Sequence, residues 1–310
     1  MPTARSRRLL TAGGFVFFWR LLAAAPVVPN MLLLDGAVVG PEIVAVGERG
    51  TILGSSDQGR SWESRASQVQ ATLTGIAFAP GGRRGWAVGH DAVILATEDG
   101  GRSWRQQWQG ENLTDSFLDV IALDERRAIA VGAFGLYVET TDGGATWTPR
   151  RLLEDDYHLN RITRGPSGTL YLAGEHGTLL RSRDQGANWD GIHSPYDGSF
   201  YGILPLGDEL LLAYGLRGRL YVSADDGETW EQVANERRSL MLTALAVGPQ
   251  RVIAAGQARA FVALDLAGRN LESAYPTMLT AVAELLLLPD GSLLCLGEGG
   301  VTILPAGAQP

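Results

Sequence analysis

Apolar residues along this chain fall in short runs, each bounded by glycine, aspartate or proline. Residues 73–107 show the pattern: "LTGIAFAP", "WAVGH", "DAVILATE" and "SWRQQ" are the apolar-rich runs, and "GGRRG" and "DGG" are the turn sequences. Such short runs between turn residues predict β-strands. No long segment carries apolar residues at helical spacing, so the pattern predicts an all-β chain with four strands in a unit of this length.

The unit repeats with a period near 42 residues. The motif Ser/Thr-x-Asp-x-Gly-x-x-Trp occurs five times, at the pairs Asp57/Trp62, Asp99/Trp104, Asp142/Trp147, Asp184/Trp189 and Asp225/Trp230. A small-apolar run that ends in a marker glycine extends the repeat to seven units, at Gly47, Gly89, Gly132, Gly174, Gly215, Gly256 and Gly297. Four strands in about 42 residues are typical of a propeller blade. Residues 26–310 are therefore predicted to form a seven-bladed β-propeller with four-stranded blades.

The chemistry of the five-fold motif is that of a turn. It falls between the third and fourth predicted strands, where the Asp carboxylate can accept backbone N–H groups and the glycine can adopt a positive φ. The tryptophan is expected to fold over its own hairpin as an apolar plug, which would make the motif a self-contained staple. Five equivalent aspartates spread around a ring serve no single reaction, so the motif predicts a structural role and not a catalytic one.

The two ends of the chain raise separate expectations. The last unit stops after "CLGEGGVTILPAGAQP", without room for a fourth strand, so residues Ala25–Pro29 or their neighbours are predicted to supply it and close the ring. Residues 1–25 combine "MPTARSRR", an apolar stretch and Ala23–Ala25, which is the pattern of an export signal. The alternative is a misassigned start codon. The expected location is the periplasm, or the thylakoid lumen if the source is phototrophic.

Composition narrows the possible partners. The formal net charge is -8, which argues against nucleic acid as a partner. The sequence contains arginine but no lysine, which excludes lysine chemistry such as a Schiff base or a phosphate-binding loop. Cys295 is the sole cysteine and lies in an apolar run, so we expect a buried strand thiol. The four histidines have no partner at ligand spacing, and neither a metal nor a cofactor is expected.

These motifs carry a family resemblance over about residues 30–305. The Ser/Thr-x-Asp-x-Gly-x-x-Trp motif resembles the Asp box, or BNR repeat, of sialidases and related propellers. Together with the preceding "AVGERGTIL"-type runs, it resembles the photosystem II stability/assembly factor family and its proteobacterial relatives. The resemblance implies a non-enzymatic seven-bladed propeller that assists membrane-protein assembly. In phototrophs the implied client is the photosystem II reaction-centre core.

A sialidase-like carbohydrate-binding or glycoside-processing propeller is the alternative function. Sialidases need an arginine triad for the substrate carboxylate, a tyrosine nucleophile with a glutamate, and an acidic proton donor. Arginines in the predicted inner strands are limited to Arg161 and Arg164, which belong to one blade. We therefore expect no enzymatic activity.

A partner site is expected where the turns after the marker glycines meet the loops that join blades. The loops "RRLLEDDYHLNR" and "HSPYDGSFYG" mix aromatic and charged residues, which suits protein contact. The alternative interpretation is that Phe200 anchors its loop to the core and that the turn arginines are solvated surface charges. The expected partner is a membrane or envelope protein, contacted by a monomer whose own membrane association is at most peripheral. The candidate contact residues are Arg49, His90, Phe134, Tyr157, His158, His176, Tyr196, Asp197, Phe200, Tyr201, Arg217 and Arg259.

Overall fold

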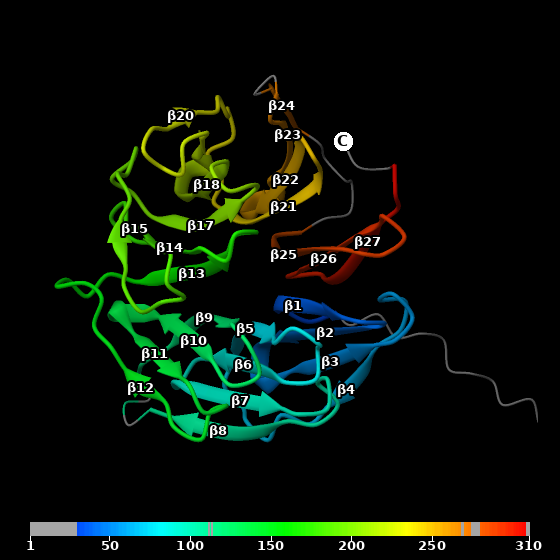
Figure 1. Ribbon diagram of the computed structural model, residues 1–310. Coiled ribbons are helices and arrows are strands. Elements are labelled where there is room, and N and C mark those ends of the chain that lie inside the picture. The colour runs from blue at the N-terminus through cyan, green and yellow to red at the C-terminus, as the bar shows by residue number, and fades with distance from the viewer. Residues whose placement is uncertain (1–29, 111, 113, 268–269, 274–279, 308–310) are drawn as a thin grey trace, which may run out of the picture.

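The computed structural model describes residues 30–110, 112, 114–267, 270–273 and 280–307. They form a ring of seven antiparallel sheets arranged around a central axis (Figure 1). The predicted all-β, seven-bladed propeller is confirmed. The predictions for residues 1–25 and for Ala25–Pro29 lie outside the described part of the chain. Within that part, no helix is long and apolar enough to cross a membrane.

Each blade runs from an inner strand at the axis to an outer strand at the rim. The inner strands are β1 (Leu33–Val39), β5 (Leu73–Phe78), β9 (Phe117–Ala122), β13 (Leu159–Arg164), β17 (Phe200–Pro205), β21 (Met241–Gly248) and β25 (Val282–Leu287). The second strands are β2 (Glu42–Gly47), β6 (Gly85–Gly89), β10 (Ala128–Gly132), β14 (Leu170–Gly174), β18 (Leu211–Gly215), β22 (Arg251–Gly256) and β26 (Leu293–Gly297).

The third strands of the blades are largely buried, whereas the fourth strands at the rim are mostly exposed. The third strands are β3 (Ile52–Ser55), β7 (Val93–Thr97), β11 (Tyr137–Thr140), β15 (Leu179–Ser182), β19 (Leu220–Ser223), β23 (Phe261–Asp265) and β27 (Gly300–Leu304). The fourth strands are β4 (Glu63–Arg65), β8 (Arg105–Gln109), β12 (Thr148–Pro149), β16 (Asp190–Gly191), β20 (Glu231–Gln232) and β24 (Asn270–Ser273). Blade seven has three strands among the described residues.

Apolar side chains between neighbouring blades form the core. The second strands are buried along almost their whole length because a blade covers each of their faces. Between blades two and three, Trp86 meets Trp147 edge to face and packs in one cluster with Phe117. Leu33 of blade one and Leu296 of blade seven belong to a similar cluster, so apolar packing joins the first and last blades, which are neighbours in the ring of Figure 1.

Close approach of two backbones explains the marker glycines. A Cβ atom on Gly47 would lie 2.1 Å from the carbonyl oxygen of Leu32, just before the inner strand. The distance for Gly89 and the carbonyl oxygen of Thr72 is also 2.1 Å, and for Gly297 and that of Ala281 it is 2.0 Å. The inner strand carries a β-bulge opposite each of these positions. A side chain would push the inner strand off its neighbour, so the repeat keeps glycine here.

The five-fold motif forms the predicted turn between the third and fourth strands. In blade one, the Ser55 hydroxyl donates to Asp57 Oδ1 over 2.9 Å and accepts the buried N–H of Gly59 over 2.9 Å. Asp57 also accepts the backbone N–H of Ser61, and Gly59 has a φ of +80°. The Trp62 indole folds back and donates to the Gly59 carbonyl over 2.9 Å. The hydroxyl, the carboxylate and the glycine of the motif therefore staple the hairpin.

The tryptophans of the motif correct the prediction that each one only plugs its own hairpin. Their rings pack against the preceding blade in the ring order. Trp104 of blade two is 4% exposed and belongs to one apolar cluster with Val44 of blade one. Trp189 of blade four meets Tyr137 of blade three edge to face, at 6.4 Å between ring centroids. The indole rings are thus part of the packing between blades.

Trp230 departs furthest from the predicted plug. Its indole N–H donates to the His193 carbonyl, which follows the outer strand of blade four, over 3.0 Å, whereas Trp62 donates within its own turn. The physical reason is the position of the turn. A Cβ atom on Gly227, beneath the Trp230 ring, would lie 2.6 Å from Ile192 of blade four. The turn itself lies against the neighbouring blade, so a ring folded over it enters the space between blades, and the motif is not self-contained.

Polar side chains also lock the turns of blades two, three and four onto the preceding blade. Arg65 of blade one donates to the Gly101 carbonyl in the turn of blade two over 2.9 Å. Gln107 of blade two reaches the Gly143 carbonyl of blade three in the same way, and Arg150 of blade three reaches the Gly186 carbonyl of blade four. The tight turn leaves these carbonyls accessible to side chains from the neighbouring blade, so the motif stiffens the ring as well as the hairpin.

Candidate functional site

Two kinds of connection share one face of the ring, which we call the loop face. The turns from second to third strands lie beside the connections between blades, as the 2.9 Å hydrogen bond from Gly177 N–H to the Gly198 carbonyl shows. Asn235 of a blade connection likewise donates to the Gly218 carbonyl of a turn. The turns carry Arg49, His90, Phe134, His176, Arg217 and Arg259, and the connections carry Tyr157, His158, Tyr196 and Asp197.

The turns of the loop face hold side chains outward on a constrained backbone. Arg49, Phe134, His176 and Arg217 have φ values of +55°, +56°, +51° and +57°. This left-handed region is uncommon for residues other than glycine and costs about 1–2 kcal/mol. All four side chains are exposed. The same backbone thus presents arginine, phenylalanine or histidine in different blades, which suits recognition better than packing.

Aromatic rings gather on the loop face at the junction of blades three and four. The Phe134 ring, 62% exposed, meets the His158 ring edge to face at 4.9 Å between centroids. The Tyr157 ring stacks on His176 at 4.4 Å. His158 Nδ1 lies 3.6 Å from Glu175 Oε1. Four of the predicted contact residues are thereby brought together in two ring pairs.

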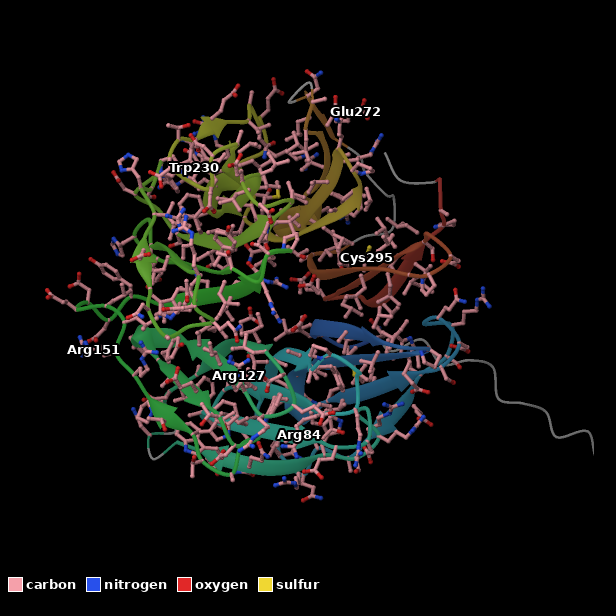
Figure 2. The ribbon with its side chains drawn as sticks, viewed as in Figure 1. Arg84, Arg127, Arg151, Trp230, Glu272 and Cys295 are labelled. Atoms are coloured by element: carbon pink, nitrogen blue, oxygen red, sulfur yellow. The ribbon has the colours of Figure 1, made fainter. Side chains whose placement is uncertain are left out.

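Beside Phe134 lies a hollow of about 320 Å³. Its apolar lining includes Leu136, Pro149 and Leu153. The loop that follows β12 forms its other wall and reaches the outer edge of the ring, where Arg151 is labelled in Figure 2.

Phe200 is not part of the exposed surface. Its side chain is fully buried, at 0% exposure, and packs edge to face against Tyr196 and Tyr221. The anchor interpretation therefore applies: Phe200 holds the blade connection to the core and cannot contact a partner directly. Tyr196 is partly exposed, stacks on Tyr221, and has the Arg219 guanidinium 5.5 Å above its ring. Tyr201 is half-buried and lines the central channel instead of the loops.

An arginine-lined hollow of about 240 Å³ opens beside the turn of blade five. None of the described residues that line it is acidic, and Arg217 and Arg238 form no ion pair with a described acid. Its lining is Arg217, Gly218, Arg219, Gln232, Asn235 and Arg238. Arg49 and Arg259 lie in the turns of other blades and do not line it. Sequence reasoning found Arg217 but missed Arg219 and Arg238.

The central channel holds a charged cluster that sequence reasoning did not identify. Asp35, Asp119, Arg161 and Glu284 occupy the same register position on four inner strands, just after the β-bulge. Together with Tyr201 they line a hollow of about 220 Å³. Arg161 forms an ion pair with Glu284 across the channel. Arg161 and Arg164 are the arginines of the described inner strands, and both belong to β13, as predicted.

The acids of this cluster tie neighbouring blades together. Asp35 accepts the N–H of Gly36 in its own strand and, over 2.7 Å, that of Ile76 in the next blade. Asp119 does the same with Val120 and, over 2.9 Å, with Ile162. Burial raises the pKa of Asp35 well above its usual range. Burial also raises the pKa of Asp119, to about 6, against the lowering effect of the Arg161 charge.

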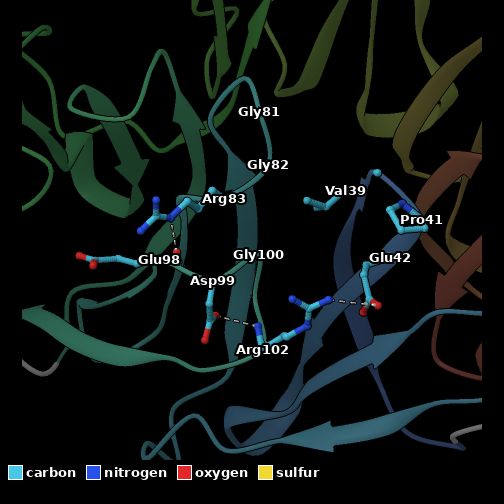
Figure 3. A pocket seen from close by; sticks show the side chains of 11 residues that line it. Val39, Pro41, Glu42, Gly81, Gly82, Arg83, Glu98, Asp99, Gly100 and Arg102 are labelled. Carbon is cyan, nitrogen blue, oxygen red and sulfur yellow. Dashed lines mark hydrogen bonds and ion pairs between the residues drawn. The ribbon is translucent and has the colours of Figure 1, made fainter.

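The opposite face carries a hollow of about 550 Å³ between blades one and two (Figure 3). Its charged groups have partners within the chain. Asp99 accepts the backbone N–H of Arg102, whose guanidinium lies 4.0 Å from Glu42, and Arg83 donates to the Glu98 carbonyl. These contacts engage the charged side chains around this hollow within the chain, which gives a ligand little to recognise.

The remaining chemistry of the chain is sparse. No group of three His, Cys, Asp or Glu residues is placed to hold a metal within the part that the structure describes. Cys295 lies in β26 and is buried, and burial raises the pKa of its thiol to about 12. Such a thiol is neither a metal ligand nor a nucleophile in the folded state.

Comparison with known proteins adds to this geometry. The family model described as photosynthesis system II assembly factor YCF48 matches residues 30–128 and 105–275. The chain belongs to this family. No curated protein matches it. The family assignment agrees with the resemblance that the repeated motifs indicated.

Solved structures support the same fold. "YCF48 bound to D1 peptide" aligns with a TM-score of 0.73 and 22% identity over 89% of this chain and 94% of that one. YCF48 from Cyanidioschyzon merolae aligns with a TM-score of 0.73 and 18% identity, over 90% and 97%. The WD40 propeller domain of Doa1 reaches 0.66 at 10% identity, over 88% and 93%. At these identities the likeness establishes the fold alone.

Proposed function

We propose that this chain is a non-catalytic, exported propeller that binds a protein partner on its loop face. Through this contact it aids the assembly or stability of a membrane or envelope complex. Membership in a family described as an assembly factor supports the proposal, as does the peptide bound to one solved relative.

The arginine-lined hollow is the observation that carries the proposal. Arg217, Arg219 and Arg238 converge there, and no acid among the described lining residues neutralises them. Guanidinium groups bind carboxylates through charge-assisted hydrogen bonds, often two at a time. We therefore expect the partner to place an acidic side chain or a C-terminal carboxylate in this hollow. The overall charge of -8 makes such a local cationic site selective, since the rest of the molecule repels acidic chains.

A crosslinked pull-down from native membranes tests the proposal. The bait is the tagged wild-type chain, compared with an Arg217→Gln/Arg238→Gln variant and with Arg102→Gln, an exposed arginine on the opposite face. We expect an integral membrane protein that the wild type and Arg102→Gln recover and the double variant loses. A charge-assisted bond contributes about 1.5–3 kcal/mol, so each lost arginine should weaken binding roughly tenfold or more. Equal recovery by all three baits would refute the site, and recovery of glycans but no protein would favour the carbohydrate alternative.

A further inference from the structure

The hollow beside Phe134 has a different chemistry from the arginine-lined one. Phe134, Leu136, Pro149 and Leu153 give it apolar walls, and Phe134 is the most exposed large apolar side chain of the described residues, at 62%. An exposed aromatic ring beside a concave apolar site is typical of a protein-contact hot spot. The volume of about 320 Å³ is at the small end for ligand pockets, which suits one large side chain and not a helix.

The two arginines at this hollow are already engaged. Arg150 donates to the Gly186 carbonyl of the next blade over 2.8 Å and lies 3.3 Å from Glu139. Arg151 donates to the Leu153 carbonyl over 2.9 Å and pairs with Asp156 at 3.1 Å. Both guanidinium groups therefore stabilise the conformation of the loop, and each is paired with a carboxylate of the same chain.

The same loop carries two acids without an ion pair among the described residues: Asp155 lines the hollow, and Glu154 precedes it in the chain. Glu154 and Asp155 are exposed and form no ion pair with any described base, while Asp155 raises the pKa of the neighbouring Tyr157 hydroxyl through its charge. The exposed Phe134 ring also lines the hollow, and aromatic rings attract cations. The hollow is thus apolar inside and anionic at its edge.

We propose that this hollow binds a large apolar side chain of the protein partner that is followed or preceded by a basic residue. The inference rests on the proposed function, and it adds a second contact of opposite charge to the arginine-lined hollow. The apolar side chain would enter beside Phe134 and Leu153, and the basic neighbour would lie over Glu154 and Asp155. Opposite charges at two points on one face would fix the direction in which an extended partner segment lies.

Selection from a random twelve-residue phage-display peptide library against the full chain tests the inference. We expect the enriched peptides to include a class with Phe, Tyr, Trp or Leu next to Arg or Lys. A synthetic peptide of this class should bind Phe134→Ala at least tenfold more weakly than the wild type. The matched control is Leu287→Ala, which removes another exposed apolar side chain, 41% exposed, outside the hollow. It should bind as the wild type does.

A separate variant tests the contribution of the acidic side chains to peptide binding. Glu154→Gln/Asp155→Asn should weaken the same peptide about threefold to tenfold at low salt, and the difference should vanish at 1 M salt because exposed charges are then screened. Urea unfolding of each variant verifies that the fold is intact.

Each other outcome overturns the inference. If the enriched peptides are acidic alone and depend on Arg217, the proposed function stands and this second contact is wrong. If apolar-basic peptides bind Phe134→Ala as well as they bind the wild type, the hollow is not their site. If no peptide is enriched, the inference fails, while the membrane pull-down still decides the proposed function.

Discussion

The hydroxyl at the start of each turn motif gives a sharp stability test. In blade five, Ser223 is 1% exposed, and its Oγ accepts the buried N–H of Gly227 over 2.8 Å. The same hydroxyl donates to Asp225 Oδ1 over 2.8 Å. Gly227 lies against Ile192 of the preceding blade, so water has no room to replace the lost oxygen. Ser223→Ala should therefore leave a buried N–H group without an acceptor.

The expected loss follows from that single unsatisfied donor. A buried polar group deprived of its partner costs about 1–3 kcal/mol, and the change removes too little volume to add a large cavity term. Ser223→Thr keeps the hydroxyl, and threonine already fills the equivalent position at Thr97 and Thr140, with the same bonds to Gly101 and Gly144. It should cost well under 1 kcal/mol.

Urea unfolding, followed by tryptophan fluorescence, measures both variants. The difference in free energy of unfolding comes from the shift in midpoint at a common slope. An alanine variant within about 0.3 kcal/mol of the wild type would refute the assigned hydrogen bond. A threonine variant as unstable as the alanine one would show that shape, and not the hydroxyl, governs the position.

Three further predictions concern buried groups. Phe200→Ala should lower the free energy of unfolding by about 3–5 kcal/mol, measured in urea, whereas Tyr157→Ala on the surface should cost far less. Burial raises the pKa of Asp119 from 3.8 to about 6, so its contribution to stability is complete below pH 3.8 and is lost as the pH rises through about 6. The urea midpoint of Asp119→Asn should therefore change less between pH 3.8 and 6 than the midpoint of the wild type does. The Cys295 thiol, with a pKa raised to about 12, should resist a thiol reagent in the native chain and react fully in urea; stoichiometric native labelling would contradict its burial.

The fold could be predicted because its determinants recur at a fixed spacing. The marker glycines and the turn motif appear at the same place in successive units, so a period near 42 residues is visible without any structure. The tertiary contacts of these residues cannot be read from the repeat in the sequence. Gly47 approaches the Leu32 carbonyl, and Trp104 and Trp230 reach the preceding blade. These contacts join residues that only the folded ring brings together.

The candidate site was less predictable because its residues do not recur. Arg238 comes from a blade connection and Arg219 directly precedes β19, and the two meet Arg217 only when the connection folds over the turn. Phe200 and Tyr157 occur in similar aromatic loops, yet one is a core anchor and the other is a surface ring. Asp119 and Glu284 could have been found, since each lies 13 residues before a marker glycine, Gly132 and Gly297.

The contrast indicates how such a ring divides its residues between structure and recognition. Positions with a structural role recur from blade to blade, and they are buried or bonded within the turn, as Ser223 and Gly227 are. The turn tips of the loop face share one left-handed backbone but carry Arg49, Phe134, His176 or Arg217. Since the backbone there is fixed at a cost while the side chain varies, packing cannot be what selects the side chain. The residues that recognise a partner should therefore be sought at positions where the blades share a backbone conformation but differ in sequence.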